Sequence, residues 1–308
     1  MKSKKGSVLI VVLVVTALLL GLALQLFETS DIAYVGVAKI HSENQGAVYA
    51  ATAFEAIASF METDNADYDA PDELWTLIPP IVIDGGYVSV IIKPADDRLP
   101  VNMLGNSDDN ISRRAREAFR HLFAEQGFDD EIWETMSDLV SKEDLTPLTT
   151  NVKGVTHNTS SNSYKITQGP IKTLAEIRNI PILRRNYSNI SKYICAGDVS
   201  GKININFASE SVIKAFLPEL SSYAAEIIEA REDEPFKAKD DVYKLLGTGA
   251  RDNYIAALPY FDVKSTLFYV HIKIDHIEFI QHYHALFKRD GRKMTLTNYI
   301  EGSSLNYY

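Results

Sequence analysis

Cysteine is almost absent from this chain of 308 residues, which contains only Cys195. A single cysteine cannot form an internal disulfide bond, so the fold must be held together by packing alone. We expect Cys195 to act as a small buried hydrophobic residue rather than as a nucleophile. The apolar content of 46% is ordinary for a folded protein, and a chain of this length can bury a substantial core.

Lysine and arginine are too few to give the chain a basic surface. They number 31 against 41 acidic residues, and the formal net charge is −10. Nucleic-acid binding depends on clustered lysine and arginine side chains that neutralise phosphates. The charge balance therefore argues against a nucleic acid as the partner.

The chain also lacks a recognisable catalytic constellation. Its seven histidines, one cysteine and many acidic residues show no spacing typical of an active site, and its serine pairs lack a Gly-x-Ser-x-Gly context. His282 and His284 would share one face of a strand, as a metal-binding pair can. We expect them, with His271 and His276, to cover a sheet surface instead. The sequence thus predicts no enzymatic activity and no assigned metal ligands.

Calcium is the one cofactor that the composition suggests. Aspartates in two acidic loops could supply the hard oxygen ligands that calcium prefers. The spacing of an EF-hand loop is absent, so we consider calcium without assigning ligands to it. The aspartates concerned are Asp64, Asp67, Asp69, Asp72, Asp108 and Asp109.

A long apolar run near the N-terminus is the strongest feature that is present. Residues 8–24 are apolar apart from one threonine, and no charge occurs between Lys5 and Glu28. At about 1.5 Å per residue, residues 6–27 span about 30 Å, the thickness of one bilayer core. A bilayer requires the backbone to satisfy its own hydrogen bonds, so we expect a transmembrane helix. The lysines before it should lie in the cytoplasm, and the rest of the chain on the other side.

Three kinds of targeting segment share this pattern. A cleaved secretory signal needs an Ala-x-Ala site after the run, which is absent here. An uncleaved anchor is the second kind. In the third, a prepilin signal, cleavage precedes the run, here between Gly6 and Ser7. The short basic leader that ends in Gly6 resembles those of type IV prepilins and type II secretion pseudopilins.

Helical periodicity continues beyond the membrane run. Apolar residues recur at steps of three and four as far as Met61, which predicts one helix over residues 7–63, transmembrane at 7–27 and amphipathic afterwards. Such a helix would be about 80 Å long, far more than a bilayer needs. Its second half should therefore pack on a domain outside the membrane.

The remaining pattern places strands at both ends and helices between them. Asp84-Gly85-Gly86 separates two apolar strands and predicts a hairpin. Further strands are expected at 266–274, 277–288 and 294–300. Helices are expected in the intervening chain, at 111–126, 130–141, 174–180, 209–217, 221–231 and 239–246, with a polar loop at 146–163.

The predicted fold class is therefore α+β. A long N-terminal helix packs on an antiparallel sheet, as in a pilin, and a large mainly α-helical domain is inserted into that sheet. The expected parts are a leader at 1–6, the helix at 7–63, sheet portions at 64–97 and 265–308, and the inserted domain at 98–264.

The inserted domain shows a weak internal repeat. Arg98-Leu99-Pro100-Val101-Asn102 and Lys202-Ile203-Asn204-Ile205-Asn206 each place a basic residue and a short apolar strand before an asparagine, and helices follow both. The repeat predicts two related sub-blocks, residues 98–200 and 201–264.

Taken in order, these segments resemble the K-type minor pseudopilins of type II secretion (GspK). Most pseudopilins carry glutamate at the fifth residue after the cleavage site, K-type members lack it, and this chain has Val11 there. Residues 97–102 resemble the Gly-Lys-Ile-Asn-Leu-Asn segment of the family, with Pro100 in place of the first asparagine. Residues 164–180 and 202–246 resemble two later segments. The Trp-Ile-Asp-x-Asp stretch of the family is reduced to residues 138–144.

The resemblance implies a non-enzymatic role at the tip of a periplasmic pseudopilus, with the I- and J-type minor pseudopilins. The inserted domain would be too wide for another subunit to follow. In other subunits the glutamate is thought to pair with the terminal amine of a neighbour within an apolar bundle. A tip subunit has no neighbour above it, so Val11 would leave no charge unpaired.

The resemblance also implies a cellular setting. The chain would be a single-pass inner-membrane protein whose C-terminal domain lies in the periplasm. Prepilin peptidase would cut between Gly6 and Ser7, the new amine would be methylated, and an inner-membrane assembly platform would join the chain to other pseudopilins. The pseudopilus would then support export of folded proteins through the outer membrane.

Two alternatives stay open. A minor tip pilin of a type IV pilus would share the leader, the helix and the processing. Residues 202–247 also resemble a helix-hairpin-helix of a membrane-anchored DNA-uptake receptor. The turn of a helix-hairpin-helix should offer backbone N–H groups to phosphate. The corresponding turn here, Leu217-Pro218-Glu219-Leu220-Ser221, contains no glycine, one proline, which lacks an N–H, and one acid. This turn argues against DNA binding.

Overall fold

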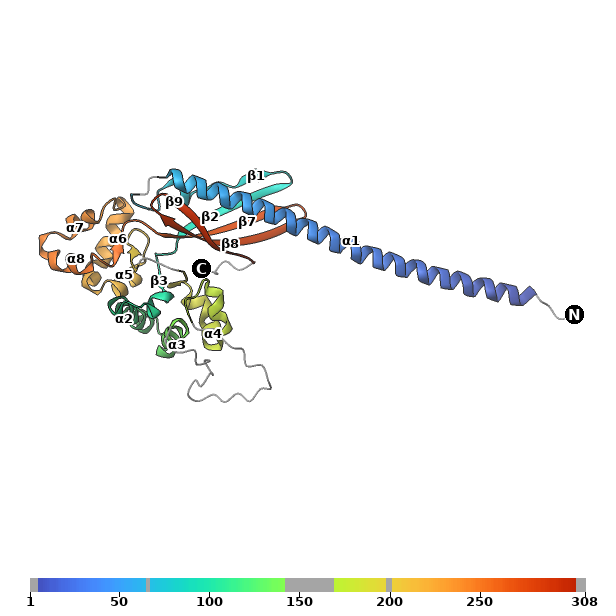
Figure 1. The fold of residues 1–308 in the computed structure, drawn as a ribbon, viewed down its shortest axis with the longest axis horizontal. Coiled ribbons are helices and arrows are strands. Elements are labelled where there is room, and N and C mark those ends of the chain that lie inside the picture. Colours follow the sequence, from blue (N-terminus) through green and yellow to red (C-terminus); the bar gives the residue numbers. More distant parts are fainter. Residues whose placement is uncertain (1–4, 65–66, 142–168, 198–200, 303–308) are drawn as a thin grey trace.

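The computed structural model describes residues 5–64, 67–141, 169–197 and 201–302. A single long helix, α1 (Lys5–Thr63), projects from the molecule, and its C-terminal part lies along a five-stranded antiparallel sheet (Figure 1). The shorter helices lie mainly at the end of the sheet away from the N-terminus of α1. The predicted mixture of helix and antiparallel sheet is confirmed.

The second half of α1 is amphipathic and buries one face on the sheet. Its buried residues, Ala50, Phe54, Ile57 and Met61, recur at steps of four, three and four, which places them on one side of a helix. They pack in one apolar cluster with strand residues from the facing side of the sheet. This helical period therefore places the C-terminal half of α1 against the sheet. We call α1 the stem.

The sheet has the order β1-β2-β7-β8-β9, and every neighbouring pair is antiparallel. The hairpin that joins β1 to β2 turns at Gly85, whose φ of +74° favours glycine. The strands are β1 (Ile81–Ile83), β2 (Gly86–Pro94), β7 (Leu267–His276), β8 (Phe279–Asp290) and β9 (Lys293–Glu301). Since β2 and β7 pair directly, the chain between them leaves the sheet and returns beside the strand it left.

That intervening chain contains the shorter helices and two pairs of very short parallel strands. Its α-helices are α2 (Asp109–Glu125), α3 (Asp130–Val140), α4 (Pro181–Ile190), α5 (Glu210–Phe216), α6 (Ala224–Asp233), α7 (Lys239–Leu246) and α8 (Arg251–Ala257). Its 3-10 segments are η2 (Val101–Gly105), η3 (Leu174–Asn179), η4 (Pro218–Tyr223) and η5 (Thr248–Ala250), and η1 (Leu74–Thr76) lies before the sheet. β3 (Leu99–Pro100) pairs with β4 (Ile194–Cys195), and β5 (Ile203–Asn204) pairs with β6 (Phe261–Asp262).

Several local expectations are corrected by the structure. Helices α4 and α8 were not predicted, and residues 174–179 form a 3-10 helix. The predicted helix at 221–231 begins later, at Ala224, because η4 occupies the preceding residues. The predicted polar loop at 146–163 lies outside the described residues. The limits of the leader, the inserted domain and its two sub-blocks stay predictions.

Within the described residues, no helix is both long enough and apolar enough to cross a membrane. The side chains of residues 7–12, where the predicted span begins, lie outside the described residues. The transmembrane segment at 7–27 therefore stays a prediction.

Candidate functional site

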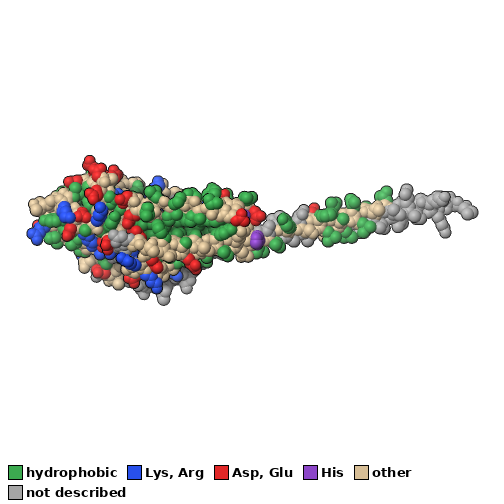
Figure 2. Space-filling view, turned by 90° about the horizontal axis from the view of Figure 1, so that it is seen from above, with side chains coloured by type: hydrophobic (Ala, Val, Ile, Leu, Met, Phe, Trp, Pro, Cys, Tyr) green, Lys and Arg blue, Asp and Glu red, His purple; other side chains and the backbone are tan. Residues whose placement is uncertain are grey.

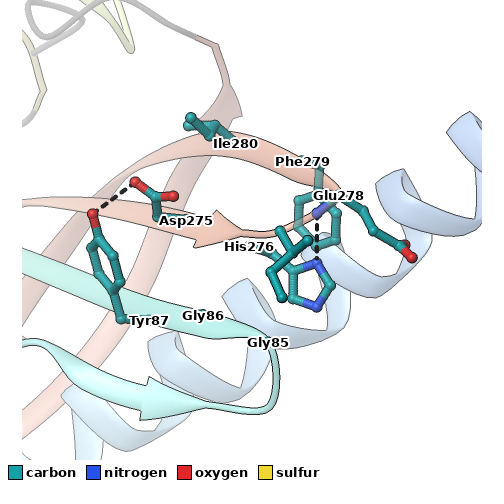
Figure 3. A pocket seen from close by; sticks show the side chains of 9 residues that line it. Gly85, Gly86, Tyr87, Asp275, His276, Glu278, Phe279 and Ile280 are labelled. Carbon is teal, nitrogen blue, oxygen red and sulfur yellow. Dashed lines mark hydrogen bonds between the residues drawn. The ribbon is translucent and has the colours of Figure 1, made fainter.

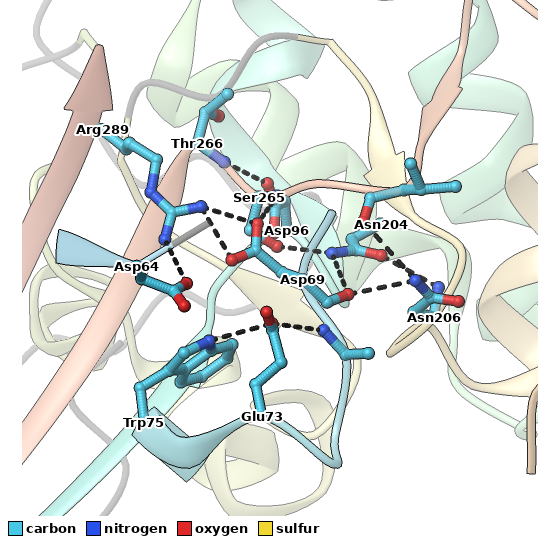
Figure 4. Close-up of polar contacts among 12 residues, drawn as sticks. Asp64, Asp69, Glu73, Trp75, Asp96, Asn204, Asn206, Ser265, Thr266 and Arg289 are labelled. Carbon is cyan, nitrogen blue, oxygen red and sulfur yellow. Dashed lines mark hydrogen bonds and ion pairs between the residues drawn. The ribbon is translucent and has the colours of Figure 1, made fainter. Parts of the chain in front are cut away.

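A buried polar junction lies where the stem, the sheet and the helical region meet (Figure 4). At its centre the two carboxylate oxygens of Asp69 accept hydrogen bonds from Arg289 Nη1, at 2.7 and 2.8 Å. Asp69 follows α1 in the chain, and Arg289 lies near the end of β8. The ion pair therefore ties the segment after the stem to the last hairpin of the sheet.

Arg289 is enclosed on several sides. Its side chain is 3% exposed, its guanidinium lies 4.5 Å from the centre of the Phe268 ring, and its Nη2 atom lies 3.8 Å from Asp64. Burial of an arginine in this way is tolerated when carboxylates and an aromatic face replace its water shell. Arg289 thus acts as the fixed cation of the junction.

The same aspartate also contacts the helical region. Its carboxylate accepts a hydrogen bond from the backbone N–H of Ser265 at 2.7 Å, and its carbonyl oxygen accepts one from Asn206 Nδ2 at 3.1 Å. Asn204 donates to Ser265 Oγ at 2.8 Å and accepts from the backbone N–H of Asn206 at 2.9 Å. These bonds link the helical region to the segment that follows α1.

Two further acids at the junction are held in poorly solvated positions. Burial raises the pKa of Asp96 to about 7, although Asp96 accepts a hydrogen bond from the Thr266 N–H at 2.9 Å. Burial likewise raises the pKa of Glu73 to about 7, against hydrogen bonds from the Ala70 N–H and Trp75 Nε1. Burial also raises the pKa of Asp69, and Arg289 opposes that rise. The physical cause is the same in each case, because burial disfavours the charged form.

The junction includes a group of acids that could hold a cation. One oxygen each from Asp64, Asp69 and Glu73 lies within 4.8 Å of the others. The donor set suits calcium, but both oxygens of Asp69 already contact the Arg289 guanidinium. A divalent ion would have to compete with this buried cation, so these residues fit an ion pair better than a metal centre.

The other aspartates considered for calcium do not form a site among the described residues. Asp67 and Asp72 are exposed, and Asp108 caps the N-terminus of α2 by accepting from the Asn110 N–H at 2.9 Å. The side chain of Asp109 lies outside the described residues. Of the sequence candidates, the structure brings only Asp64 and Asp69 together.

The two halves of the helical region repeat one hydrogen-bond arrangement. Asn102 donates to the Ile171 carbonyl and accepts from the Ile171 N–H, both at 2.8 Å. Asn206 makes the same two bonds with Phe236, at 2.9 and 3.0 Å. The sequence did not predict that these asparagines bond to later segments of the chain. This repeated arrangement agrees with the repeat noted there.

The repeat extends to the turns that follow. Glu176 accepts from the backbone N–H groups of Lys172 and Thr173, and Asp241 accepts from those of Lys237 and Ala238. Each acid thus caps the N-terminus of the helix in which it lies, η3 for Glu176 and α7 for Asp241. The same chemistry therefore anchors one turn in each half of the helical region.

The hairpin turn that could bind phosphate is occupied from within the chain. Arg114 of α2 forms two bonds to the Glu219 carboxylate, at 3.0 and 2.6 Å, and donates to the Phe216 carbonyl at 2.9 Å. Its guanidinium also lies 3.6 Å from the centre of the Tyr260 ring. The turn presents an acid that is already paired, which disfavours a nucleic-acid backbone at this position.

The lone cysteine is structural. Cys195 lies in β4 with no exposed surface, and burial raises the pKa of its thiol. A buried thiol with a raised pKa holds little thiolate, so it is a poor nucleophile. The expectation of a small buried residue is confirmed.

The histidines on the sheet form a cluster that the sequence only partly suggested. His282 and His284 share a face of β8 as expected, and the register adds His271 of β7 beside them. His276 lies apart, at the hairpin between these strands, stacked on Phe279. Burial lowers the pKa of both His271 and His284 to about 4.

The end of the sheet nearest the free part of the stem carries a shallow open groove of about 600 Å³ (Figure 3). It lies between the tips of the β1–β2 and β7–β8 hairpins, where Tyr87 donates a hydrogen bond to Asp275 at 2.8 Å. Ile277 and Ile280 are largely exposed beside it. None of the residues that line the groove is a buried charged group that would suit a small polar ligand, so we assign no binding role to it.

Hydrophobic side chains gather along the stem and the neighbouring sheet, whereas charged side chains gather at the far end (Figure 2). The exposed hydrophobic residues of α1 include Tyr34, Val37, Ile40 and Val48. Exposed hydrophobic residues outside α1 include Leu74, Leu77, Ile81 and Val82. Large exposed apolar areas commonly mark contacts with other proteins. This distribution suits a subunit that packs through its stem side.

The predicted processing positions lie at the start of α1. The backbone is helical at Gly6, Ser7 and Val11, and their side chains lie outside the described residues. Cleavage between Gly6 and Ser7 and the significance of Val11 therefore stay predictions.

A long N-terminal helix laid on an antiparallel sheet, with its second half amphipathic, defines a pilin-like subunit, here enlarged by a helical region between β2 and β7. Comparisons with known proteins narrow this class. A family profile described as "Type II secretion system (T2SS), protein K" matches residues 203–264. The "Type II secretion system protein K" of Pseudomonas aeruginosa is 26% identical over 214 residues, which cover 66% of this chain and 64% of that protein.

A solved structure gives the same result at the level of the fold. A chain from the crystal structure of the GspK-GspI-GspJ complex of enterotoxigenic Escherichia coli superposes with a TM-score of 0.66 and 16% sequence identity. The match covers 86% of this chain and 98% of that one. The resemblance to the K-type family that the sequence predicted is confirmed by these comparisons.

Proposed function

We propose that this chain is a non-enzymatic minor pseudopilin of a type II secretion system, placed at the tip of the pseudopilus. The observation that carries the proposal is the combination of a pilin-like stem on a sheet with a large helical region between β2 and β7. Similarity to protein K of Pseudomonas aeruginosa and to the fold in the GspK-GspI-GspJ complex supports it. The helical region widens the end of the molecule opposite the stem, which would hinder a further subunit from stacking there.

In this proposal the partners are the I- and J-type minor pseudopilins, and the contacts run along the stem side. The exposed apolar residues of α1 lie where a second pilin-like helix would pack. The role is to initiate or cap assembly, so that the pseudopilus can support export of folded proteins through the outer membrane. A strain that lacks this chain should retain its secreted substrates in the periplasm.

Processing and location form part of the same proposal. The chain would be held in the inner membrane by residues 7–27, with its C-terminal domain in the periplasm. Prepilin peptidase would cut between Gly6 and Ser7, and the new amine would be methylated. Mass spectrometry of the mature N-terminus, after coexpression with prepilin peptidase, tests this directly. An intact leader, or cleavage after the apolar run, would contradict it.

Val11 can be tested separately. In a tip subunit, Val11→Glu would place a carboxylate in an apolar bundle without a neighbouring amine, at a cost of several kcal/mol. We expect this variant to lower secretion, whereas Val11→Leu should leave it unchanged. Equal secretion by both variants would show that the position does not distinguish a tip subunit.

A minor tip pilin of a type IV pilus is the second candidate, because the stem fold and the leader are common to both systems. Partner choice separates the two. Binding to I- and J-type pseudopilins supports type II secretion, and binding only to type IV minor pilins supports the alternative. DNA uptake is disfavoured by the Arg114–Glu219 pair, and a gel shift at low salt would test it.

A further inference from the structure

Three histidine rings stack on the face of the sheet that points away from α1. Ile272 and Tyr283 pack in the apolar cluster beneath α1, so alternation along β7 and β8 turns the histidines to the other face. His271 and His284 are direct cross-strand partners, with ring centres 4.6 Å apart and planes within 9°. His282 also stacks on His271, with ring centres 5.2 Å apart. We call these three residues the histidine stack.

Two of these rings are shielded from water. His271 is 5% exposed, and His284 has no exposed surface. His271 Nε2 lies 3.0 Å from His282 Nδ1, and His284 Nδ1 lies 2.6 Å from the Tyr269 hydroxyl. A hydrogen bond with the backbone of Gly302 also holds His284. When the rings are neutral, the two histidines can share one N–H···N bond and the tyrosine can donate its proton to the third ring.

Protonation disrupts these contacts. A proton on His284 Nδ1 makes that nitrogen a donor, so the Tyr269 hydroxyl can no longer donate to it. If His271 and His282 both carry the extra proton, two N–H groups face each other at 3.0 Å between nitrogens. Charged rings also repel each other at the short distances between their centres. The geometry therefore favours neutral rings.

The ionisable groups around the histidine stack do not supply a free anion to it. On the same face of β7, Lys273 adds a cation, and Asp275 is already bonded to Lys273 at 2.7 Å and to Tyr87 at 2.8 Å. Near Tyr269, further ionisable groups among the described residues are Lys93 of β2, Arg98 with its partner Asp97, Tyr187 of α4 and Cys195 of β4. Burial lowers the pKa of both His271 and His284 to about 4, and neighbouring histidines lower it further.

The histidine stack adjoins a contact between the sheet and the helical region. Tyr269 and Leu286 form the next cross-strand pair on the same face, and both pack in one cluster with Cys195 of β4. A Cβ atom at Gly197 would lie 2.8 Å from the Leu286 side chain, so the chain after β4 also lies close against the sheet. Tyr269 therefore connects the buried ring of His284 to the surface on which this part of the helical region lies.

We propose that the histidine stack is an acid-sensitive latch, which holds the Cys195 side of the helical region on the sheet while its rings are neutral. In acid, His271 and His284 take up protons and the rings separate. The contact of Tyr269 with Cys195 then opens while the rest of the chain stays folded.

The direction of the pH dependence follows from the two states. The pKa of a histidine in water is about 6.5, whereas the pKa of His271 and of His284 is about 4 when the contact is closed. Between these values the open form binds more protons, so acid favours opening. The contribution of the two rings is fully present above pH 6.5 and is lost as the pH falls towards 4. Asp96 has the opposite effect, because its pKa is raised by burial.

Cys195 is a natural probe of the opening, because it is fully buried and is the only cysteine of the chain. The purified full-length chain in detergent is reacted with a dipyridyl disulfide at pH 7 and at pH 5. Each rate is divided by the rate of the urea-unfolded chain at the same pH. We expect this corrected rate to be roughly 100-fold higher at pH 5, because each of the two rings contributes roughly tenfold. Far-UV circular dichroism at pH 5 should still be that of the folded chain.

Two variants assign the effect to the histidine stack. His271→Phe and His284→Phe each remove one titrating ring but keep an aromatic group, so the rise should fall to roughly tenfold. The thermal midpoint at pH 7 shows whether each variant folds, and either one that folds is sufficient. His276→Gln, at the hairpin outside the histidine stack, is the matched control and should keep the full rise.

Four results would overturn the proposal. The corrected rate could be the same at pH 7 and pH 5, or the folded phenylalanine variants could keep the full rise of the parent. His276→Gln could abolish the rise. Finally, circular dichroism could show that the whole chain unfolds at pH 5, in which case Cys195 would not report a local opening.

Discussion

At Asp69 and Arg289, one buried ion pair joins residues that are far apart in the sequence. The pair fixes the segment after α1 against β8, and the same aspartate contacts the helical region through Ser265 and Asn206. A buried charge that loses its partner still carries its desolvation cost. Removing one member of the pair therefore lowers the free energy of unfolding by more than the intact pair adds to it. Its role here is to fix the geometry of three parts of the molecule.

Replacement of Arg289 by methionine should therefore be strongly destabilising. We expect a loss of roughly 3–5 kcal/mol in the free energy of unfolding, because Asp69 would be left buried and unpaired. Urea denaturation of the full-length chain in detergent measures it. Arg292→Met, in the exposed turn that follows, is the control and should change stability by less than about 0.5 kcal/mol. Equal effects of both variants would show that the pair is not structural.

Asp96 predicts the pH dependence of stability. Its pKa is about 7 in the folded chain and about 4 in the unfolded chain, so the folded state holds the extra proton between these values. The contribution of Asp96 to the free energy of unfolding is therefore fully present below pH 4 and is lost as the pH rises through 7. Between pH 5 and pH 8 the free energy of unfolding of the parent should fall by roughly 2–3 kcal/mol relative to that of Asp96→Asn. Denaturation curves that shift in parallel for both proteins would exclude this contribution.

At the scale of elements, the stem was the part that the sequence predicted best. Its apolar residues keep helical steps over many turns, and Asp84-Gly85-Gly86 marks the first hairpin just as clearly. Strands of two residues, such as β4 and β6, carry no period that a sequence can show. Helix α8 has only seven residues, too few to show a period, whereas α4 does show one, with Leu183, Tyr187 and Ile190 buried at steps of four and three. Tertiary packing, rather than local preference, defines the short strands and α8.

Phe54 should anchor the stem to the sheet. It is 6% exposed and packs against the rings of Phe287 and Tyr299, with centres 6.0 and 6.2 Å away. Phe54→Ala should destabilise the chain by roughly 3–5 kcal/mol through the cavity it leaves. Phe60→Ala, on the same helix at 41% exposure, should cost less than half as much. Similar losses in urea denaturation would show that the buried face of α1 is not where we place it.

Gly105 fixes the contact between η2 and α3. A Cβ atom there would lie 2.2 Å from the Val140 carbonyl oxygen, so backbone would have to move. We expect Gly105→Ala to cost roughly 1–3 kcal/mol, as overpacking does. Gly249→Ala has nothing within 4 Å of its new methyl group and should be nearly neutral. A thermal midpoint for Gly105→Ala that matches that of Gly249→Ala would contradict this packing.

At the scale of the whole molecule, the buried junction links the helical region to the sheet and to the segment that follows α1. The junction could not be predicted from the sequence, because it pairs Asp69 with Arg289 and Asp96 with Thr266 across the entire inserted chain. Sequence patterns indicated an acidic loop after α1, and from it we considered calcium. In the structure, the cation that pairs with Asp69 is the side chain of Arg289 in β8. Such long-range contacts depend on topology, which local patterns do not encode.

The most direct test of the proposed function is co-purification with the I- and J-type pseudopilins of the same organism. The full-length processed chain, extracted in detergent, should elute with both as one complex in size-exclusion chromatography. Phe54→Ala, which loosens the stem, should reduce the yield of that complex, and Phe60→Ala should reduce it less. If the I- and J-type subunits bind each other while this chain elutes alone, it is not their partner at a pseudopilus tip.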